Sequence, residues 1–408
     1  MTDPALPARH DFLRRHNFGL VLTTIAARGP LSRAQLAVDT GLTKATVSQL
    51  AERLVSCGLV RELEPARGAV GRPGSPLELD RKGIVGLGVE IAADYLAVCA
   101  ADLSGAVVIH RVEGRDNRGA APSAVIDRVA ALVHAVREDL QATGRSALGV
   151  SVAVPGLVEG GHTVRLAPNL PGWTDLPLAA HLSVALATQL PIEAENEANL
   201  AALAELWYGI ATDLDFIHVS GEIGVGGGVV VDGAVFRGVR GFAGELGHVT
   251  VDPAGPLCGC GSTGCLEQYA GQDALLRAAG VTGDSSTRDG DPNGPLRELV
   301  SRAEAGDERT TAALDAAGRA IGLAVAAVVN ILDVPTVVLG GIYAPLAQWL
   351  VAPVEAELRL RALANRWDPV TVLVSTLGTQ AAVRGAAGVC VDRVLRDPVS
   401  YFPVLQLG

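Results

Sequence analysis

Three cysteines and one histidine stand close together near the middle of the chain. Cys258, Cys260 and Cys265 fall within eight residues, and His248 precedes them by ten positions. One imidazole and three thiolates make a complete tetrahedral ligand set for Zn²⁺, and the glycines between the cysteines let a loop wrap tightly around a metal. Because no coordination position is left for water, the sequence predicts a structural zinc site, with a loop of free thiols as the alternative.

Two glutamates flank this cluster. Glu245 lies three residues before His248, and Glu267 lies two residues after Cys265. A metal that holds the histidine and the cysteine would also fix these neighbouring carboxylates, which are good acceptors for the hydroxyl groups of a sugar. The alternative is that both glutamates are solvated surface charges.

Further polar side chains could bind a polyol. Asn196 and Glu197 stand at an expected strand-to-helix turn, where an ordinary capped helix start explains them equally well. Asn169 lies in a rigid turn, and on its own it reads as a plain turn residue. Glycine-rich turns at 221–228 and 340–341 would let backbone N–H groups approach phosphates, although hairpin glycines are common.

The chain begins with a helix-turn-helix pattern at 12–63, which precedes the elements that must position these residues. Ser32 opens a capping box for one helix, Gly41 breaks it, and Thr43 caps a second helix that runs to about Cys57. This second helix has one apolar stripe, formed by Val47, Leu50, Ala51 and Leu54. Its other face is polar, which is typical of a DNA-recognition helix.

Two short alternating segments follow, at 59–63 and 77–79. Between them lies a loop rich in glycine, proline and arginine, at 65–76. Together they predict a β-wing. The head ends near Gly83, where the pattern changes.

From Gly83 onward, apolar strands alternate with helices. The repeated order of strands, hairpin and helix predicts two related α/β lobes with a cleft between them. A polar, turn-rich surface loop is expected at 280–296. The expected strands are 84–90, 95–100, 147–154, 216–220, 228–231 and 335–341, and the expected helices are 122–143 and 311–332.

Charge is distributed unevenly along the 408 residues. Residues 1–83 carry a balance of +4, and the remainder carries −15, which together give the net charge of −11. A basic head on an acidic body suits a DNA-binding module joined to a small-molecule domain. The N-terminus lacks the apolar core of a signal peptide, and apolar tracts such as 318–332 are too short and glycine-broken to span a bilayer, so we expect a cytoplasmic protein with no membrane partner.

Taken together, these motifs resemble the ROK family of repressors, open reading frames and kinases. Residues 84–390 resemble its two-lobed, actin/hexokinase-like ATPase body, and residues 12–80 resemble the winged helix-turn-helix that precedes that body in the family's repressors. The most specific stretches are 244–248 and 258–267. The resemblance implies an α/β fold.

The resemblance also implies a domain division. A winged helix-turn-helix domain would occupy residues 1–82 and a sugar-binding ROK domain residues 83–408. The lobes of the second domain would cover about 83–200 plus the C-terminal helix, and 201–380.

The same resemblance assigns site residues. It implies Zn²⁺ at His248, Cys258, Cys260 and Cys265. It implies sugar contacts from Asn169, Asn196, Glu197, Glu245, His248 and Glu267. His248 would serve both sites, with one ring nitrogen on the metal and the other toward the sugar.

Two departures from the family's kinases favour a sensor over an enzyme. The kinases cradle ATP phosphates with an Asp-x-Gly-Gly-Thr turn, and here the matching stretch is Glu90-Ile91-Ala92-Ala93-Asp94. Two methyl groups and an added negative charge are hostile to ATP. Glu197 replaces the catalytic aspartate and is one methylene longer, which misplaces a general base. We therefore expect no kinase catalysis beyond a weak residual activity, and no ATP cofactor.

The expected partners are operator DNA and a sugar. Lys44, Thr46, Ser48 and Gln49 would face the major groove, and Arg72 the minor groove, with a phosphate contact as its alternative. A homodimer or homotetramer is expected, since one small head reads too little sequence. The sequence thus predicts a repressor of carbohydrate-uptake or catabolism genes, relieved by a sugar. The alternatives are an active ATP-dependent sugar kinase with a DNA-binding head, and an activator or constitutive DNA-binding protein.

Overall fold

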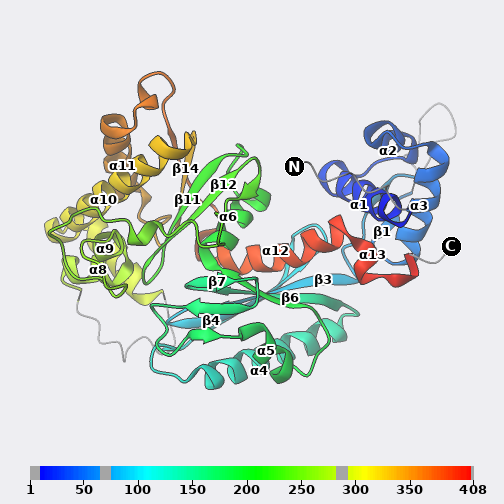
Figure 1. Cartoon of the computed structure of the whole chain (residues 1–408), viewed down its shortest axis with the longest axis horizontal. Coiled ribbons are helices and arrows are strands. Elements are labelled where there is room, and N and C mark those ends of the chain that lie inside the picture. The colour runs from blue at the N-terminus through cyan, green and yellow to red at the C-terminus, as the bar shows by residue number, and fades with distance from the viewer. Residues whose placement is uncertain (1–9, 65–74, 282–292, 406–408) are drawn as a thin grey trace, which may run out of the picture.

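The computed structural model describes residues 10–64, 75–281 and 293–405, which form a small head and a body of two lobes (Figure 1). The head contains three helices and a two-stranded antiparallel sheet. Its elements are α1 (His10–Arg28), α2 (Arg33–Thr40), α3 (Lys44–Ser56), β1 (Val60–Glu62) and β2 (Leu77–Leu79).

The two helices of the helix-turn-helix, α2 and α3, begin where the sequence predicts. Ser32 forms the complete capping box of α2 with Gln35, and Gly41 ends the helix in the left-handed conformation. The side chain of Thr43 accepts from the backbone N–H of Thr46 and caps α3. The predicted apolar stripe of α3 is buried, and β1 pairs with β2 as the wing requires. The tip of the wing, with Arg72, lies outside the described residues.

The two lobes of the body repeat one sheet topology. The first sheet has the order β10-β6-β3-β4-β5, and the second has the order β15-β14-β11-β12-β13. The central strand is β3 in the first sheet and β11 in the second. On one side of it lie two antiparallel strands that follow it directly in the chain, and on the other side lie two later strands that run parallel to it. This correspondence confirms the prediction of two related α/β lobes.

The strands of these sheets are as follows. The first contains β3 (Ile84–Ile91), β4 (Tyr95–Asp102), β5 (Val107–Gly114), β6 (Ser146–Val154) and β10 (Ile192–Asn196). The second contains β11 (Phe216–Gly221), β12 (Val225–Val231), β13 (Ala234–Val235), β14 (Thr336–Gly341) and β15 (Thr371–Val374). A small extra sheet, which the sequence analysis did not anticipate, contains β7 (Leu157–Glu159), β8 (Thr163–Leu166) and β9 (Thr174–Leu176).

Helices cover the outer faces of both sheets. In the first lobe α4 (Pro122–Ala142) and α5 (Leu178–Ala185) share one core with the strands. The second lobe carries α7 (Glu267–Ala270), α8 (Gln272–Ala279), α9 (Gly294–Glu304), α10 (Glu308–Leu332) and α11 (Ala347–Arg361). Because α9 begins at Gly294, the last residues of the expected 280–296 loop are helical instead; residues 282–292 lie outside the described part.

One helix of the described chain, α10, is long and apolar enough to cross a membrane by length and composition. More than half of its most apolar window is buried inside the lobe. Its apolar residues pack against α8 and α11, which is how the core helix of a folded domain behaves.

Two helices fill the space between the lobes. They are α6 (Glu197–Tyr208) and α12 (Ala381–Arg396), which pack against each other and against strands of the sheets. From this position α12 continues toward the head, where it is followed by α13 (Pro398–Tyr401) (Figure 1). Val391, Val394, Val399 and Leu405 belong to the same buried cluster as Phe18 and the rest of the head's core. The head and the end of α12 therefore share one hydrophobic core.

Candidate functional site

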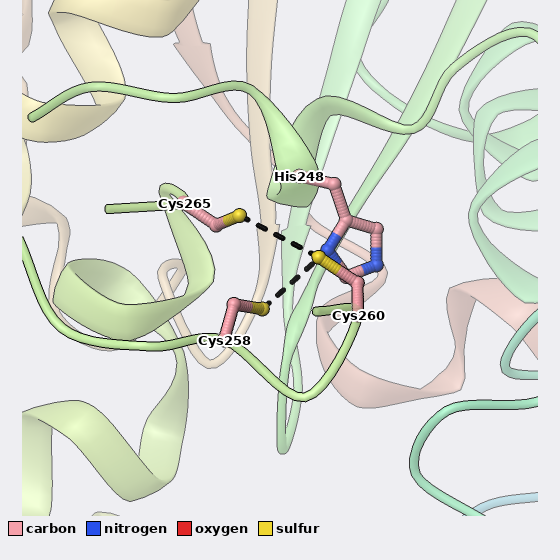
Figure 2. A group of neighbouring side chains, drawn as sticks. All are labelled: His248, Cys258, Cys260 and Cys265. Atoms are coloured by element: carbon pink, nitrogen blue, oxygen red, sulfur yellow. Dashed lines mark hydrogen bonds between the residues drawn. The ribbon is translucent and has the colours of Figure 1, made fainter. Parts of the chain in front are cut away.

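The four predicted metal ligands converge. Figure 2 shows His248 and the three cysteines facing a common point, and their ligand atoms all lie within 4.8 Å of one another. His248 Nδ1 is 3.8 Å from Cys258 Sγ, and Cys260 Sγ is 3.7 Å from Cys265 Sγ. The loop is closed by a backbone hydrogen bond from Cys258 to Ser262 and by isolated bridges that pair Thr250 with Cys265 and Leu257 with Thr263.

These distances fit a tetrahedral zinc ion. With Zn–S bonds of about 2.3 Å and Zn–N of about 2.0 Å, two sulfurs lie about 3.8 Å apart and a sulfur and a nitrogen about 3.6 Å apart. The cluster can therefore hold a metal without rearranging its backbone. The other cysteines stand apart from it: Cys99 and Cys390 are buried, and Cys57 is half-buried.

A pocket of about 450 Å³ lies beside the cluster. Its walls include glycine-rich segments at 224–227 and Gly156. The structure brings all six residues of the sequence-based sugar set to this one pocket: Asn169, Asn196, Glu197, Glu245, His248 and Glu267. They come from both lobes, since Asn169 follows β8, Asn196 ends β10, and Glu245 and Glu267 belong to the second lobe. The glycine-rich turn expected at 221–228 is shorter in the structure, because Val225 already belongs to β12, and residues 224–227 border this pocket.

His248 connects the pocket to the cluster of three cysteines. Its Nδ1 faces Cys258, while its Nε2 is 4.0 Å from Glu245 Oε2. Glu267 also touches both regions, because its Oε1 is 3.9 Å from Cys258 Sγ and a side chain at Gly224 would collide with its other oxygen. A metal at the cysteines would consequently fix the orientation of the groups that line the pocket.

Asn196 and Glu197 occupy the junction between β10 and α6. The Asn196 side-chain oxygen accepts from the N–H groups of Ala198 and Asn199, and its amide nitrogen donates to the carbonyl of Gly156 at 3.0 Å. The amide is therefore a helix cap as well as part of the pocket wall. This geometry directs the adjacent Glu197 side chain between the lobes.

Several acidic groups surround Glu197. Desolvation, together with the charges of Glu90 and Asp94, raises the pKa of its carboxyl to about 8. Burial likewise raises the pKa of Glu90 to about 7, although the Tyr95 hydroxyl donates to it at 2.6 Å. The carboxyl of Glu197 is therefore mainly protonated at pH 7.

Glu222 is the functional residue that the sequence analysis missed. It lines the same interlobe cavity of about 240 Å³ as Glu90, Glu197 and Ser220, and burial raises its pKa well above the ordinary value. A side chain at Gly341 would meet its carboxylate. In the sequence, the available signal was that Glu222 is a single acidic residue inside a glycine-rich turn. A loop that binds phosphate would not be expected to carry a negative charge at that place.

The turn that corresponds to the kinase phosphate loop is packed with side chains. Ala92 and Ala93 are buried, and Glu90 is 1 % exposed. The Asn117 side chain donates to the carbonyls of Ala92 and Tyr95 at 2.8 and 3.1 Å. The loop is thereby fixed in a conformation in which Glu90 and Asp94 line a pocket, whereas Ala92 and Ala93 pack into the hydrophobic core.

The sequence-based DNA set lies on α3. Lys44 and Gln49 are exposed, and Thr46 and Ser48 are partly exposed. Thr46 also takes part in the helix cap, with its hydroxyl 2.8 Å from that of Thr43. The buried stripe of α3 faces the core of the head, so the opposite face is open to a partner.

A winged helix-turn-helix joined to a two-lobed body with a sugar-kinase-like cleft defines a class of DNA-binding regulators. The ROK family model matches residues 86–393, and the MarR family model matches residues 19–69. The chain belongs to the ROK family.

Full-length relatives share both parts. The chain is 28 % identical over 389 residues to the xylose repressor of Bacillus subtilis strain 168. The alignment covers 95 % of this chain and 98 % of the relative. The crystal structure of a ROK family transcriptional regulator, a homologue of the E. coli MLC protein, superposes with a TM-score of 0.78 at 25 % identity, covering 97 % of this chain and 99 % of that one.

A kinase structure matches the body alone. The ROK family glucokinase from Streptomyces griseus, in complex with glucose and AMPPNP, is 28 % identical with a TM-score of 0.65. The match covers 98 % of the glucokinase but 75 % of this chain. The chain is thus a DNA-binding ROK regulator that is similar over its full length to a xylose repressor.

Proposed function

We propose that this sugar-responsive, DNA-binding repressor releases its operator when a neutral sugar binds beside the metal cluster, and that it does so without phosphorylating the sugar. The observation that carries the proposal is the 450 Å³ pocket, where all six sequence-based sugar residues meet. Carboxyl, amide and imidazole groups that converge on one small pocket suit the hydroxyls of a monosaccharide. Because a xylose repressor is similar over the full length, xylose is the first sugar to test.

The neighbouring cavity supports the absence of phosphoryl transfer. Three carboxyl groups, Glu90, Glu197 and Glu222, line it. Burial raises the pKa of all three carboxyl groups, and a triphosphate would meet these acidic groups where a phosphate-binding loop offers backbone N–H donors. The protonated Glu197 would also have to lose its proton before it could accept one from a sugar hydroxyl.

A path from the pocket to the head runs through α12. The short helix η4 (Gly378–Gln380) leads directly into α12, and Thr379 lines the cavity with Glu197. The other end of α12 shares the core of the head. A sugar that changes the closure of the two lobes would therefore move α12 and reposition the head, which links the two binding equilibria.

The remaining assignments complete the proposal. Zn²⁺ held by His248 and the three cysteines would be structural and would keep the imidazole and Glu267 in place for the sugar. The exposed face of α3 would enter the major groove, with Lys44, Thr46, Ser48 and Gln49 as contacts, and Arg72 would enter the minor groove. Two or four copies would present paired heads to the operator. The repressed genes would serve carbohydrate uptake or catabolism in the cytoplasm.

The test measures operator affinity and turnover on the same protein. Fluorescence anisotropy with DNA from the chain's own promoter is titrated with xylose, glucose and N-acetylglucosamine, for the wild type, for Glu267→Gln and for the control Glu298→Gln on α9. Release by a neutral sugar, lost in Glu267→Gln only, supports the proposal. Binding that no sugar alters would indicate a constitutive DNA-binding protein.

A coupled ADP-release assay with the same sugars covers the rival function. We expect no ADP production above that of Glu197→Ala. Turnover that depends on Glu197 would overturn the proposal in favour of an active kinase.

A further inference from the structure

Glu195 connects the two lobes beside the sugar pocket. This residue precedes Asn196 at the end of β10, and its side chain is 19 % exposed. Its Oε1 accepts from the backbone N–H of Asn196 at 3.0 Å and from Asn199 Nδ2 at 3.1 Å. Its Oε2 accepts from Arg237 Nε of the second lobe at 2.9 Å. One carboxylate therefore holds a sugar residue of the first lobe and an arginine of the second.

Arg237 begins a closed loop that leads to Glu245. The N–H of Ala243 donates to the carbonyl of Arg237 at 3.1 Å, so the loop is closed at its base. Gly244 follows with a φ of 100°, and a Cβ atom there would stand 2.5 Å from the carbonyl oxygen of Gly227. Because this backbone is tightly confined, the position of Arg237 constrains that of Glu245.

Asn199 on α6 supports the same arrangement from the interior. Its side chain is buried, and its Nδ2 donates to Glu195 while its Oδ1 lies 3.8 Å from the point where a Cβ of Gly244 would stand. Its backbone N–H donates to the side chain of Asn196. Asn199 therefore lies between the strand that ends in Asn196 and the segment that carries Glu245.

We propose that Glu195 is a positioning residue for the sugar, and that its ion pair with Arg237 is a clasp that keeps the two halves of the sugar pocket together. Asn196 stands on one side of this clasp and Glu245 on the other, and both line the pocket. The apparent affinity for a ligand falls with the fraction of molecules in which the whole site is assembled. The clasp raises that fraction in the sugar-free protein. This inference rests on the proposed function, because it assigns a role in that same pocket.

The exposure of Arg237 determines the size and the signature of the effect. Its side chain is 48 % exposed, and exposed ion pairs change an equilibrium constant by up to about fivefold. Salt screens such pairs, whereas a neutral sugar carries no charge of its own. An affinity for a neutral sugar that falls with ionic strength therefore reports ion pairs that join the lobes. Arg118 and Asp273 form another such pair at 3.6 Å, so the clasp is seen in the difference between the wild type and a clasp variant.

Isothermal titration calorimetry of the full chain measures the affinity for xylose, glucose and N-acetylglucosamine at about 0.05 M and about 1 M NaCl. The clasp variants are Arg237→Gln, Glu195→Gln and the double variant. Glu195→Gln keeps an oxygen that accepts from Asn196. The matched control is Arg111→Gln, because Arg111 is also exposed and pairs with Asp139 inside the first lobe.

Hydrogen–deuterium exchange in the absence of sugar provides a second readout. The amides of residues 237–246 should exchange faster in both clasp variants than in the wild type and in Arg111→Gln, because Arg237 no longer holds the loop against Glu195. Circular dichroism identifies any variant that fails to fold. Since Arg237 is exposed in a loop, Arg237→Gln keeps the test valid if Glu195→Gln unfolds.

At low salt we expect the sugar affinity of Arg237→Gln and of Glu195→Gln to fall about three- to fivefold. The double variant should be no weaker than either single variant, because both substitutions remove the same interaction. At high salt the affinity of the wild type should approach that of the clasp variants, whereas Arg111→Gln should follow the wild type throughout.

Three results would overturn the clasp: losses that add in the double variant, an equal salt dependence in the wild type and the clasp variants, or unchanged exchange at residues 237–246. If the clasp variants bind sugar as the wild type does while Glu267→Gln loses binding, the clasp fails and the proposed function stands. A wild type that binds none of the sugars overturns both.

Discussion

Gly19 in α1 lies directly against the backbone carbonyl of Arg396 at the last turn of α12, so closely that a methyl group at Gly19 would overlap the carbonyl oxygen. Around this contact, Arg15 pairs with Asp397 and Arg53 Nη1 donates to the Leu405 carbonyl at 3.3 Å. The head is therefore attached to the body by close backbone packing, and an exposed ion pair adds little to it.

The contact at Gly19 predicts a variant that separates sensing from DNA binding. Gly19→Val must push α1 away from α12, because the obstructing atom belongs to the backbone. Overpacking of this kind costs about 1–3 kcal/mol. We expect the free energy of unfolding to fall by that amount, and sugar to change operator affinity several-fold less than in the wild type, while affinity for the sugar itself stays the same.

The matched control is Gly83→Ala, between the head and the body, where an added methyl group meets no atom within 4 Å. Calorimetry gives sugar affinity and fluorescence anisotropy gives operator affinity for both variants. An unchanged sugar response in Gly19→Val would show that the α1–α12 contact does not transmit the signal.

Metal removal should weaken the sugar site as well as the fold. Cys260→Ser removes one exposed ligand, and we expect metal content to fall, the thermal midpoint to drop and sugar affinity to decrease by about 10–100-fold, because His248 and Glu267 lose their anchor. Metal analysis, thermal unfolding and calorimetry measure these quantities. Cys57→Ser, outside the cluster, should behave as the wild type; equal effects of both substitutions would contradict a metal role.

The buried Glu90 predicts a particular pH dependence of stability. Its carboxyl has a pKa of about 7 in the folded chain, whereas the ordinary pKa of a glutamate is 4.5. Between these values the folded state binds more protons than the unfolded state, so its stability falls as pH rises and the loss is complete above the folded pKa. Glu90→Gln cannot ionise but still accepts from Tyr95. We expect the wild type to lose roughly 3 kcal/mol relative to this variant between pH 5 and pH 8.

Urea unfolding at several pH values gives this difference directly. Glu298→Gln, exposed on α9, serves as the control and should show no such trend. A constant difference between wild type and Glu90→Gln across the range would mean that a bound cation or another partner keeps Glu90 ionised.

The polar face of α3 predicts two distinguishable losses in DNA binding. Lys44→Ala should weaken binding to operator and unrelated DNA alike and reduce the salt slope by about 1. Gln49→Ala should lose about 1–3 kcal/mol on the operator only, because amide groups read base edges. Competition binding at two salt concentrations separates them. Lys82→Ala, an exposed lysine outside the helix, is the control; equal losses in all three variants would exclude a specific role for α3.

Local patterns made much of the head and the metal cluster predictable. The capping box of Ser32 and Gln35 and the cap at Thr43 depend on residues three apart, and such signals do not require knowledge of the fold. The ligands Cys258 to Cys265 lie on one loop, so their convergence followed from spacing. The convergence of Asn169 with Glu267 came from a family resemblance, since no local pattern relates positions so far apart.

Other features depend on contacts between distant segments. Arg237 pairs with Glu195 across 42 positions and Arg393 with Glu193 across 200, so neither pair leaves a periodic signal in the sequence. Glu222 was missed because the glycines around it were interpreted as a phosphate-binding turn. The short strands of β7, β8 and β9 hold too few residues for alternation to be recognised.

The shared core of the head and α12 also bears on synthesis. Arg15 and Asp397 are 382 positions apart, so α1 leaves the ribosome long before the helix on which it rests. At 5–20 residues per second this interval lasts roughly 20 to 75 seconds. Throughout it, the apolar side of α1 that later meets Val391 and Val394 has nothing to cover it. The head therefore completes its hydrophobic core only after the last helices of the body have been synthesised.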